Sequence, residues 1–259
     1  MAGGKRLWKS TGVKSCEDAG FAGGRALLAL VKCGDSYAPT YRVQAVDPRT
    51  GKATWTYKVP QGVKAVYLVS SRPAVIAVAA GDIVPTDLIT LDGRGKYQAT
   101  IDLPEERCLD TCHRQLFGNV ETCDSIVVGR DQLFLATEGD VLDGNEIVSF
   151  DLVTGKTARK FGPKDMTELY PLRMSGDRLL ALQTGRVSAP SAVVSLDPRT
   201  GKETPFLAFS PPDMYTLNDP EHADFIVEDG RVFLSTRELE PENSGEWKGE
   251  AYGAFGAEP

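Results

Sequence analysis

Short apolar runs, each preceded by a turn-forming Gly, Asp or Arg, recur at nearly regular intervals along this chain. A short apolar run between turn signals is typical of a β-strand that is buried on both faces. We therefore predict one such inner strand in every copy of the pattern. The copies are GGRALLAL (23–30), SRPAVIAV (71–78), GRDQLFLA (129–136), SGDRLLAL (175–182) and EDGRVFLS (228–235).

A second pattern keeps the same interval and consists of an apolar strand, an aspartate, a turn and a further strand. Its aspartates are 45, 59 and 46 residues apart, which is the spacing of propeller blades made of four short strands. The sequence thus predicts an all-β fold, a β-propeller of four-stranded antiparallel blades with about five repeats. The copies are VQAVDPRTGKATW (43–55), LITLDGRGKYQAT (88–100), IVSFDLVTGKTAR (147–159) and VVSLDPRTGKETP (193–205).

The residues of the second pattern have structural roles that follow from their chemistry. In the first copy we expect Asp47 to accept hydrogen bonds from turn amides, Gly51 to adopt a positive φ, and Trp55 to lie on the next strand. We assign the same kind of role to the equivalent residues, and we assign no catalytic residue. The equivalents are Trp8, Asp92, Asp151, Gly155, Asp197 and Gly201.

The two ends of the chain resemble complementary halves of the second pattern. Residues 251–259 are similar to its first half, with Phe255 at the place of Leu196, and residues 3–9 are similar to its second half. We predict that both ends complete one blade, or else that they are cut ends of a longer array within a seven- or eight-bladed disc. Since the repeats run on without a linker, residues 1–259 are predicted to form a single domain.

Charge and hydropathy narrow the class of partner. The chain has a net charge of −7 and an isoelectric point near 5.0, whereas binding to a phosphate backbone requires clustered Lys and Arg, so we expect no nucleic acid partner. The sequence has no apolar run of membrane-spanning length, and residues 1–12 lack the apolar segment of a signal peptide. We therefore expect no membrane insertion by this chain.

Ala45, Asp47, Thr50, Gly51 and Trp55 match a signature of the form A-x-D-x-x-T-G-x-x-x-W. This signature resembles that of the pyrroloquinoline quinone (PQQ)-like propeller repeat, a family that includes quinoprotein alcohol dehydrogenases and the scaffold lipoprotein of outer-membrane protein assembly. The resemblance implies that the signature Trp docks between neighbouring blades. The later copies depart from it, with Thr100, Arg159 and Pro205 aligned at the Trp position.

The resemblance leaves two classes of function open. The favoured class is a non-catalytic scaffold, and the alternative is a quinoprotein dehydrogenase with PQQ and calcium. The resemblance implies that such an enzyme carries a disulfide between adjacent cysteines, and no Cys-Cys pair occurs in this sequence. An acidic stretch offers oxygen ligands for calcium without the spacing of an EF-hand loop, and its Asp143-Gly144 pair favours a hairpin tip instead. The stretch comprises Glu138, Asp140, Asp143, Asn145 and Glu146. We expect no cofactor and a protein that is not an enzyme.

The five cysteines favour disulfides. Cys16 and Cys33 are symmetric about the Gly23-Gly24 turn, so paired strands place them opposite each other, and we predict a disulfide. Cys123 is predicted to pair with Cys108 or Cys112 within an insertion. The alternative for the insertion is a zinc site of Cys108, Cys112, His113 and Cys123.

The favoured function is a non-catalytic scaffold for protein–protein interaction or ligand sensing in a bacterial cell envelope. The disulfides and the family resemblance indicate an extracytoplasmic location, and a domain of a longer anchored or secreted protein fits the missing signal. We expect an unknown protein or a small ligand to bind at a propeller face or in the central channel. The candidate loops are 104–123 and 209–221, with His113, Phe117, Met214 and Tyr215 as contact groups.

Overall fold

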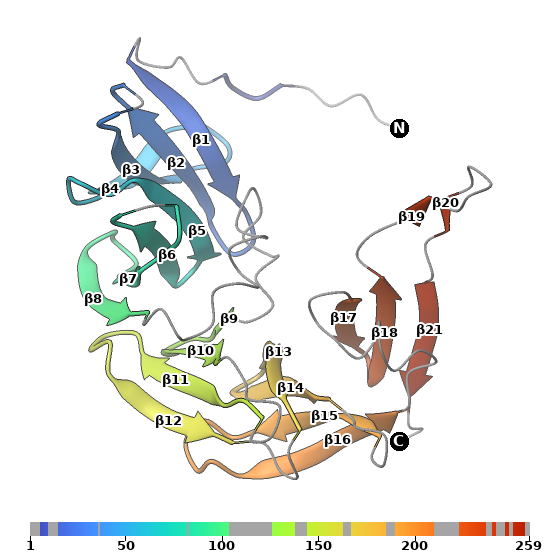
Figure 1. The fold of residues 1–259 in the computed structure, drawn as a ribbon. Coiled ribbons are helices and arrows are strands. Elements are labelled where there is room, and N and C mark those ends of the chain that lie inside the picture. The colour runs from blue at the N-terminus through green and yellow to red at the C-terminus, as the bar shows by residue number, and fades with distance from the viewer. Residues whose placement is uncertain are drawn as a thin grey trace. The chain divides into compact units, whose positions relative to one another are not determined.

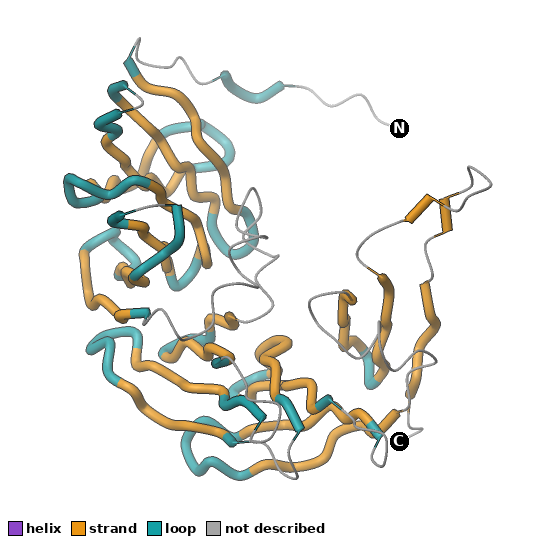
Figure 2. The backbone as a smooth tube through the Cα atoms, in the orientation of Figure 1, coloured by secondary structure: helices purple, strands orange, loops and turns teal. Residues whose placement is uncertain are grey.

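The structure is a computed structural model, and the part of the chain that it describes is built from strands and turns, without a helix (Figure 2). This all-β architecture agrees with the short apolar runs of the sequence. The described residues are 6–9, 15–35, 37–81, 83–103, 126–137, 144–162, 167–184, 190–209, 223–236, 240–241, 247–248 and 251–256.

Four sheets are four-stranded antiparallel meanders with the same strand order, which confirms the predicted β-propeller fold class (Figure 1). The first blade contains β1 (Cys16–Ala22), β2 (Leu27–Cys33), β3 (Thr40–Val46) and β4 (Ala53–Lys58). The second contains β5 (Ala65–Ser71), β6 (Ala74–Ala79), β7 (Asp87–Leu91) and β8 (Tyr97–Asp102). The third contains β9 (Ile126–Val128), β10 (Gln132–Ala136), β11 (Ile147–Asp151) and β12 (Thr157–Phe161), and the fourth contains β13 (Leu169–Ser175), β14 (Arg178–Gln183), β15 (Ser191–Leu196) and β16 (Glu203–Phe209).

The fifth sheet obtains its third strand from the C-terminal segment. It consists of β17 (Ala223–Glu228), β18 (Arg231–Thr236) and β21 (Ala251–Gly256), while β19 (Glu240–Pro241) and β20 (Trp247–Lys248) form a separate hairpin. Phe255 lies opposite Val232, just as Leu196 lies opposite Leu179 in the fourth blade. The C-terminal segment therefore has the place that the sequence alignment gave it. That residues 3–9 complete the same blade stays a prediction, as does the native number of blades.

The chain divides into two compact units. Unit 1 comprises Met1–Cys123, Arg130–Gln132 and Phe150–Lys156, and unit 2 comprises Asp124–Gly129, Leu133–Ser149 and Thr157–Pro259. The single domain over residues 1–259 stays a prediction.

Each core forms where the inner strands of successive blades pack together. All six residues of β6 are buried, because both faces of this strand are covered, whereas the outer strand β4 is exposed at alternate positions. In unit 1 one cluster joins the first two blades, with Leu28, Val43, Ile76 and Leu91 almost inaccessible to solvent. Unit 2 has two further clusters, one between the third and fourth blades and one between the fourth and fifth.

Within unit 1 two tryptophans dock on the glycine turn of the following blade. A Cβ added to Gly51 would lie 2.5 Å from Cδ2 of Trp8, and one added to Gly95 would collide with the ring of Trp55, so only glycine lets each indole rest there. Trp8 Nε1 also donates a hydrogen bond of 2.8 Å to the carbonyl oxygen of Pro48. The Trp55–Gly95 contact joins the first blade to the second, as the family resemblance implies for its signature Trp.

The next junction in unit 1 lacks a tryptophan and uses a threonine. The turn after Asp92 is one residue shorter than the others, so Ala99, and not the aligned Thr100, pairs with Thr90 as Trp55 pairs with Ala45. Ala99 is too small to carry a donor across the junction. The hydroxyl of buried Thr90 instead donates a 2.6 Å hydrogen bond to the carbonyl oxygen of Leu152, the residue that corresponds to Pro48.

In unit 2 an arginine has the place of the tryptophan. Arg159 Nε donates to the carbonyl oxygen of Pro198 at 3.2 Å, and Arg159 Nη2 donates to that of Arg199 at 2.7 Å. Its guanidinium lies over Gly201, where an added Cβ would approach Nη1 to 2.9 Å. Arg159 thus reproduces both parts of the Trp8 contact, the flat group on the glycine and the N–H donated to the carbonyl.

The disulfide predicted between Cys16 and Cys33 is present. The register of β1 and β2 places the two residues opposite each other, as their symmetry about the Gly23-Gly24 turn required. The bond joins the two strands at the end away from this turn, so the β1–β2 hairpin is closed at both ends.

The Trp55–Gly95 contact predicts a coupled pair of substitutions. Gly95→Ala should lower the free energy of unfolding by about 3 kcal/mol, because it adds left-handed strain and displaces the indole. In a protein that already carries Trp55→Ala, Gly95→Ala should lower the free energy of unfolding by only about 1 kcal/mol, because only the left-handed strain remains. Gly62→Ala is the matched control, since Gly62 also has a positive φ but open space around its Cβ position. Urea unfolding of the wild type, the two single variants and the double variant measures the coupling between Trp55 and Gly95. Strictly additive changes in the free energy of unfolding would contradict it.

The role of Arg159 predicts that tryptophan can replace it. Arg159→Ala removes two charge-assisted hydrogen bonds and should lower the free energy of unfolding by about 2 kcal/mol. Arg159→Trp restores one donor and a flat group over Gly201, so it should cost about 1 kcal/mol or less. Lys160→Ala, which removes a surface ion pair, serves as control. If Arg159→Trp is as unstable as Arg159→Ala in urea unfolding, the proposed equivalence fails.

The disulfide predicts a loss of stability when it is removed. Replacement of Cys16 and Cys33 by serine frees a loop with a sequence separation of 17 and should lower the free energy of unfolding by about 3 kcal/mol. Asp18→Ser, an exposed change on the same strand, should have little effect. Guanidinium unfolding measures both variants. Alkylation of Cys16 and Cys33 in the native protein without reductant would show that the bond is not formed.

Candidate functional site

The repeat aspartates hold turns. Oδ1 of each accepts backbone hydrogen bonds from the turn that follows, for example from Arg49 N to Asp47 at 2.8 Å and from Thr154 N to Asp151 at 2.7 Å. These hydrogen bonds hold the carboxylate in its charged form and lower the pKa of all four side chains below the ordinary value; at Asp151 the Thr154 hydroxyl contributes most. The glycine that ends each turn has a positive φ. The residues are Asp47, Asp92, Asp151 and Asp197 with Gly51, Gly95, Gly155 and Gly201.

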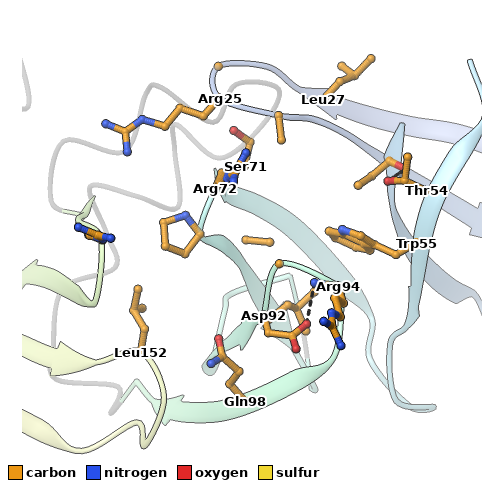
Figure 3. A pocket seen from close by; sticks show the side chains of 18 of the residues that line it. Arg25, Leu27, Thr54, Trp55, Ser71, Arg72, Asp92, Arg94, Gln98 and Leu152 are labelled. Atoms are coloured by element: carbon orange, nitrogen blue, oxygen red, sulfur yellow. Dashed lines mark hydrogen bonds between the residues drawn. The ribbon is translucent and has the colours of Figure 1, made fainter. Parts of the chain in front are cut away.

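Unit 1 contains a cavity of about 1290 Å³ at the turn ends of its strands (Figure 3). Its walls come from the β1–β2, β5–β6 and β9–β10 hairpins and from the turns that follow β3, β7 and β11. The cavity therefore lies where several blade segments of unit 1 end together. The lining segments are 23–27, 45–46, 48, 54–55, 71–74, 91–94, 98, 130–131 and 152–153.

Four arginines line this cavity together with two aspartates. Arg25, Arg72 and Arg130 are at the same place in three hairpins, two residues before the second strand, and Arg94 is on the β7–β8 turn. In Figure 3 the labelled Arg25, Arg72 and Arg94 extend from three different turns around the cavity. The lining thus carries an excess of positive charge on a chain whose net charge is −7.

The hairpins that carry these arginines are held together by short contacts. A Cβ added to Gly24 would lie 3.3 Å from the hydroxyl oxygen of buried Ser71, so the first two hairpins approach each other closely. Leu152 N donates to the carbonyl oxygen of Asp131 at 3.0 Å, and the carbonyl oxygen of Leu152 accepts the hydrogen bond from Thr90. The arginines are therefore presented by a fixed framework.

The remaining wall is apolar. Half-buried Trp55 lies beside the turn of Asp92, and Leu27, Pro73 and Leu152 line the cavity with it (Figure 3). The carboxylate of Asp92 is occupied by the amides of Arg94 and Lys96, each at 2.8 Å. The arrangement suits a ligand that combines negative charge with apolar groups.

Several residues singled out by sequence lie outside the described residues. These are Cys108, Cys112, His113, Phe117 and Cys123 in the insertion, Glu138, Asp140 and Asp143 in the acidic stretch, and Met214 and Tyr215 in the Pro-rich loop. The zinc alternative, the second disulfide and the two candidate loops therefore stay predictions.

Two members of the acidic stretch are described, and both have structural partners. The amide of buried Asn145 pairs with the backbone of Leu169, accepting from its N–H at 2.6 Å and donating to its carbonyl oxygen at 3.0 Å. Glu146 forms an ion pair of 2.9 Å with Lys160. Gly144 adopts a positive φ, and the hairpin tip at Asp143-Gly144 stays a prediction because Asp143 lies outside the described residues.

Within the described residues no group of three His, Cys, Asp or Glu side chains is placed to hold a metal ion. None of the described segments is a helix of the length and apolar character needed to cross a membrane.

The cavity arginines were missed because sequence analysis treated them as turn residues. A usable signal was present, since Arg recurs two residues before the inner strand in three successive repeats. In the fourth repeat the arginine is one position later, at Arg178, the first residue of β14. Arg178 is two residues before Leu180, whereas Arg25 and Arg72 are three residues before Leu28 and Val75, the residues with the same place in the strand register.

Comparison with known proteins places this chain in no named family. No family model matches it, and no curated protein sequence does.

Solved structures with a related fold are similar at low identity. BamB from Moraxella catarrhalis is 11% identical with a TM-score of 0.38, over 89% of this chain and 73% of that chain. The Cps50 (Swd1) β-propeller domain of Myceliophteria thermophila is 16% identical with a TM-score of 0.42, over 92% and 73%. A chain from a study of two prolyl endopeptidases is 16% identical with a TM-score of 0.43, over 86% of this chain and 29% of that chain. This chain thus spans less than a third of that peptidase, and no likeness here bears on binding or catalysis.

Proposed function

We propose that this chain is a non-catalytic β-propeller scaffold of the PQQ-like type that binds a protein partner in the cell envelope. The binding site is the arginine-lined cavity of unit 1. The partner contacts side chains on the hairpin turns, while the repeat residues maintain the fold beneath them.

The observation that carries this proposal is that some polar side chains of unit 1 stabilise its turns and junctions, whereas others line the cavity and do not. The carboxylates of Asp47 and Asp92 accept hydrogen bonds from turn amides, and the hydroxyl of Thr90 donates to the carbonyl oxygen of Leu152. Among the described residues, no hydrogen bond or ion pair engages the side chains of the four exposed arginines that line the cavity, nor those of Gln98 and Asp131 beside them. Such groups are suited to recognition, since arginine is favoured at binding surfaces.

Two further observations support the finer points of the proposal. Docking of Trp8 and Trp55 on glycine turns is the contact that the PQQ-like resemblance implies, and that family includes a scaffold of outer-membrane protein assembly. The Cys16–Cys33 disulfide supports an oxidising compartment, because such bonds are rare in a reducing cytosol. The competing function is a PQQ- and calcium-dependent dehydrogenase.

Photocrosslinking from the cavity tests the scaffold proposal. p-Benzoylphenylalanine is introduced at Val153, which lines the cavity and is 59% exposed, and in a second protein at Ile226, which is equally exposed but lies in unit 2 outside the cavity lining. In cells that express the protein, the probe at Val153 should give a discrete adduct with another protein. The probe at Ile226 should not give that adduct.

A dehydrogenase assay provides the opposing result. The purified chain is incubated with PQQ, calcium, a primary alcohol and an electron-accepting dye. A scaffold should leave the dye oxidised. Dye reduction together with the absence of an adduct at Val153 would overturn the proposal in favour of the enzyme.

A further inference from the structure

The cavity arginines differ from a structural arginine of the same pattern. Arg178 in the fourth blade donates to Ser195 Oγ at 2.6 Å and forms an ion pair of 3.5 Å with Asp197. In the described part of the chain, by contrast, no hydrogen bond or ion pair engages the guanidinium of Arg25, Arg72 or Arg130. Arg25, Arg72 and Arg130 therefore form no polar side-chain contact that would hold the described part of the fold together.

The grouping of these cations favours an anionic ligand. Three hairpins bring arginines of like charge to one cavity. Of the two aspartates that line it, Asp92 accepts hydrogen bonds from turn amides, and Asp131 does not accept one from them. Low-dielectric walls concentrate the field of grouped charges within a cleft, so a negative group entering it is attracted from a distance. The cavity lining, with four arginines and two aspartates, thus has a charge opposite in sign to the net charge of −7 of the chain.

The size and the apolar wall of the cavity narrow the ligand further. Its volume of about 1290 Å³ exceeds the range of about 300–1,000 Å³ that is usual for small-molecule pockets. Trp55 and Leu27 offer apolar area that a phosphate backbone would not use. Three or four arginines on an acidic protein also provide little counterion release for a nucleic acid. A polypeptide segment with both carboxylates and apolar side chains satisfies all of these features.

We propose that the cavity of unit 1 binds an acidic peptide segment of a partner protein, with Arg25, Arg72 and Arg130 as the residues that select carboxylates. This inference rests on the proposed scaffold function and adds the chemistry of its partner. Each guanidinium offers a forked pair of N–H donors to a carboxylate, and apolar side chains of the segment pack on Trp55.

Fluorescence anisotropy with defined peptides tests this specificity on the full chain. The probe is a fluorescein-labelled peptide in which glutamate alternates with leucine and glycine, and the matched peptide has lysine in place of each glutamate. The wild-type chain should bind the glutamate peptide at least tenfold more tightly than the lysine peptide. The affinity should fall as salt is raised, since the contacts are ionic.

Arginine variants locate the binding. Arg25→Ala, Arg72→Ala and Arg130→Ala should each weaken the glutamate peptide by about tenfold, in line with loss of a charge-assisted hydrogen bond. Arg72→Lys, which keeps the charge but lacks the fork, should fall between wild type and Arg72→Ala. Arg42→Ala is the control, because Arg42 is exposed on β3 and does not line the cavity. Circular dichroism checks that each variant is folded.

Three results would overturn the inference: equal binding of the two peptides, unchanged binding by the folded arginine variants, or stronger arginine-dependent binding of heparin than of the glutamate peptide. The last result would make the cavity a polyanion site. A Val153 adduct that persists while the glutamate peptide fails to bind would reject the acidic segment and leave the scaffold intact. Absence of both the adduct and peptide binding would reject the scaffold as well.

Discussion

The fold depends on one contact, the docking of a flat or polar group from one blade on the aspartate–glycine turn of the next. The carbonyl after the aspartate accepts a hydrogen bond from Thr90 and from Arg159 at two junctions between blades, and from Trp8 of the N-terminal segment. The positive-φ glycine beneath it leaves no room for a Cβ at Gly51 or Gly95. The aspartate organises the turn, the turn offers the carbonyl, and the carbonyl orients the neighbouring blade. Loss of the signature tryptophan therefore need not mean loss of the junction.

The repeated turn contact can be made by different side chains because it needs only two groups. These are an N–H or O–H donor and a group that covers the glycine. Indole satisfies both with one side chain, and the guanidinium of Arg159 does the same with its Nε and its plane. At the shorter turn of Asp92 the two tasks separate. The hydroxyl of Thr90 provides the donor, and the backbone at Thr100 covers Gly155. A substitution that appears to break the repeat in an alignment can thus preserve the contact that the repeat exists to make.

Sequence reasoning succeeded where the period of the pattern carries the information. The interval between aspartates gave the blades, the symmetry of Cys16 and Cys33 gave the disulfide, and the alignment of Phe255 with Leu196 gave the register of the last strand. It failed where three-dimensional spacing matters. The alignment placed Thr100 at the docking position because it ignored the shortened turn, and structure places Ala99 there. The cavity arginines are far apart in sequence, and their hairpins are brought together by contacts such as the approach of Gly24 to Ser71 and the hydrogen bond from Leu152 N to the carbonyl oxygen of Asp131.

Arginine has two places in the repeated hairpin. In one it stabilises the blade, and in the other it lines the cavity. When the arginine begins the inner strand, as Arg178 does, its guanidinium reaches across the sheet to Ser195 and Asp197 and becomes part of the blade. When it is one position earlier in the register, as in Arg25 and Arg72, the backbone is already within the turn and the side chain lines the cavity. A shift of one position keeps the residue type but moves its side chain from the sheet to the cavity. Because the turn is fixed by backbone contacts, this shift changes which side chains line the cavity at little cost to the fold beneath it.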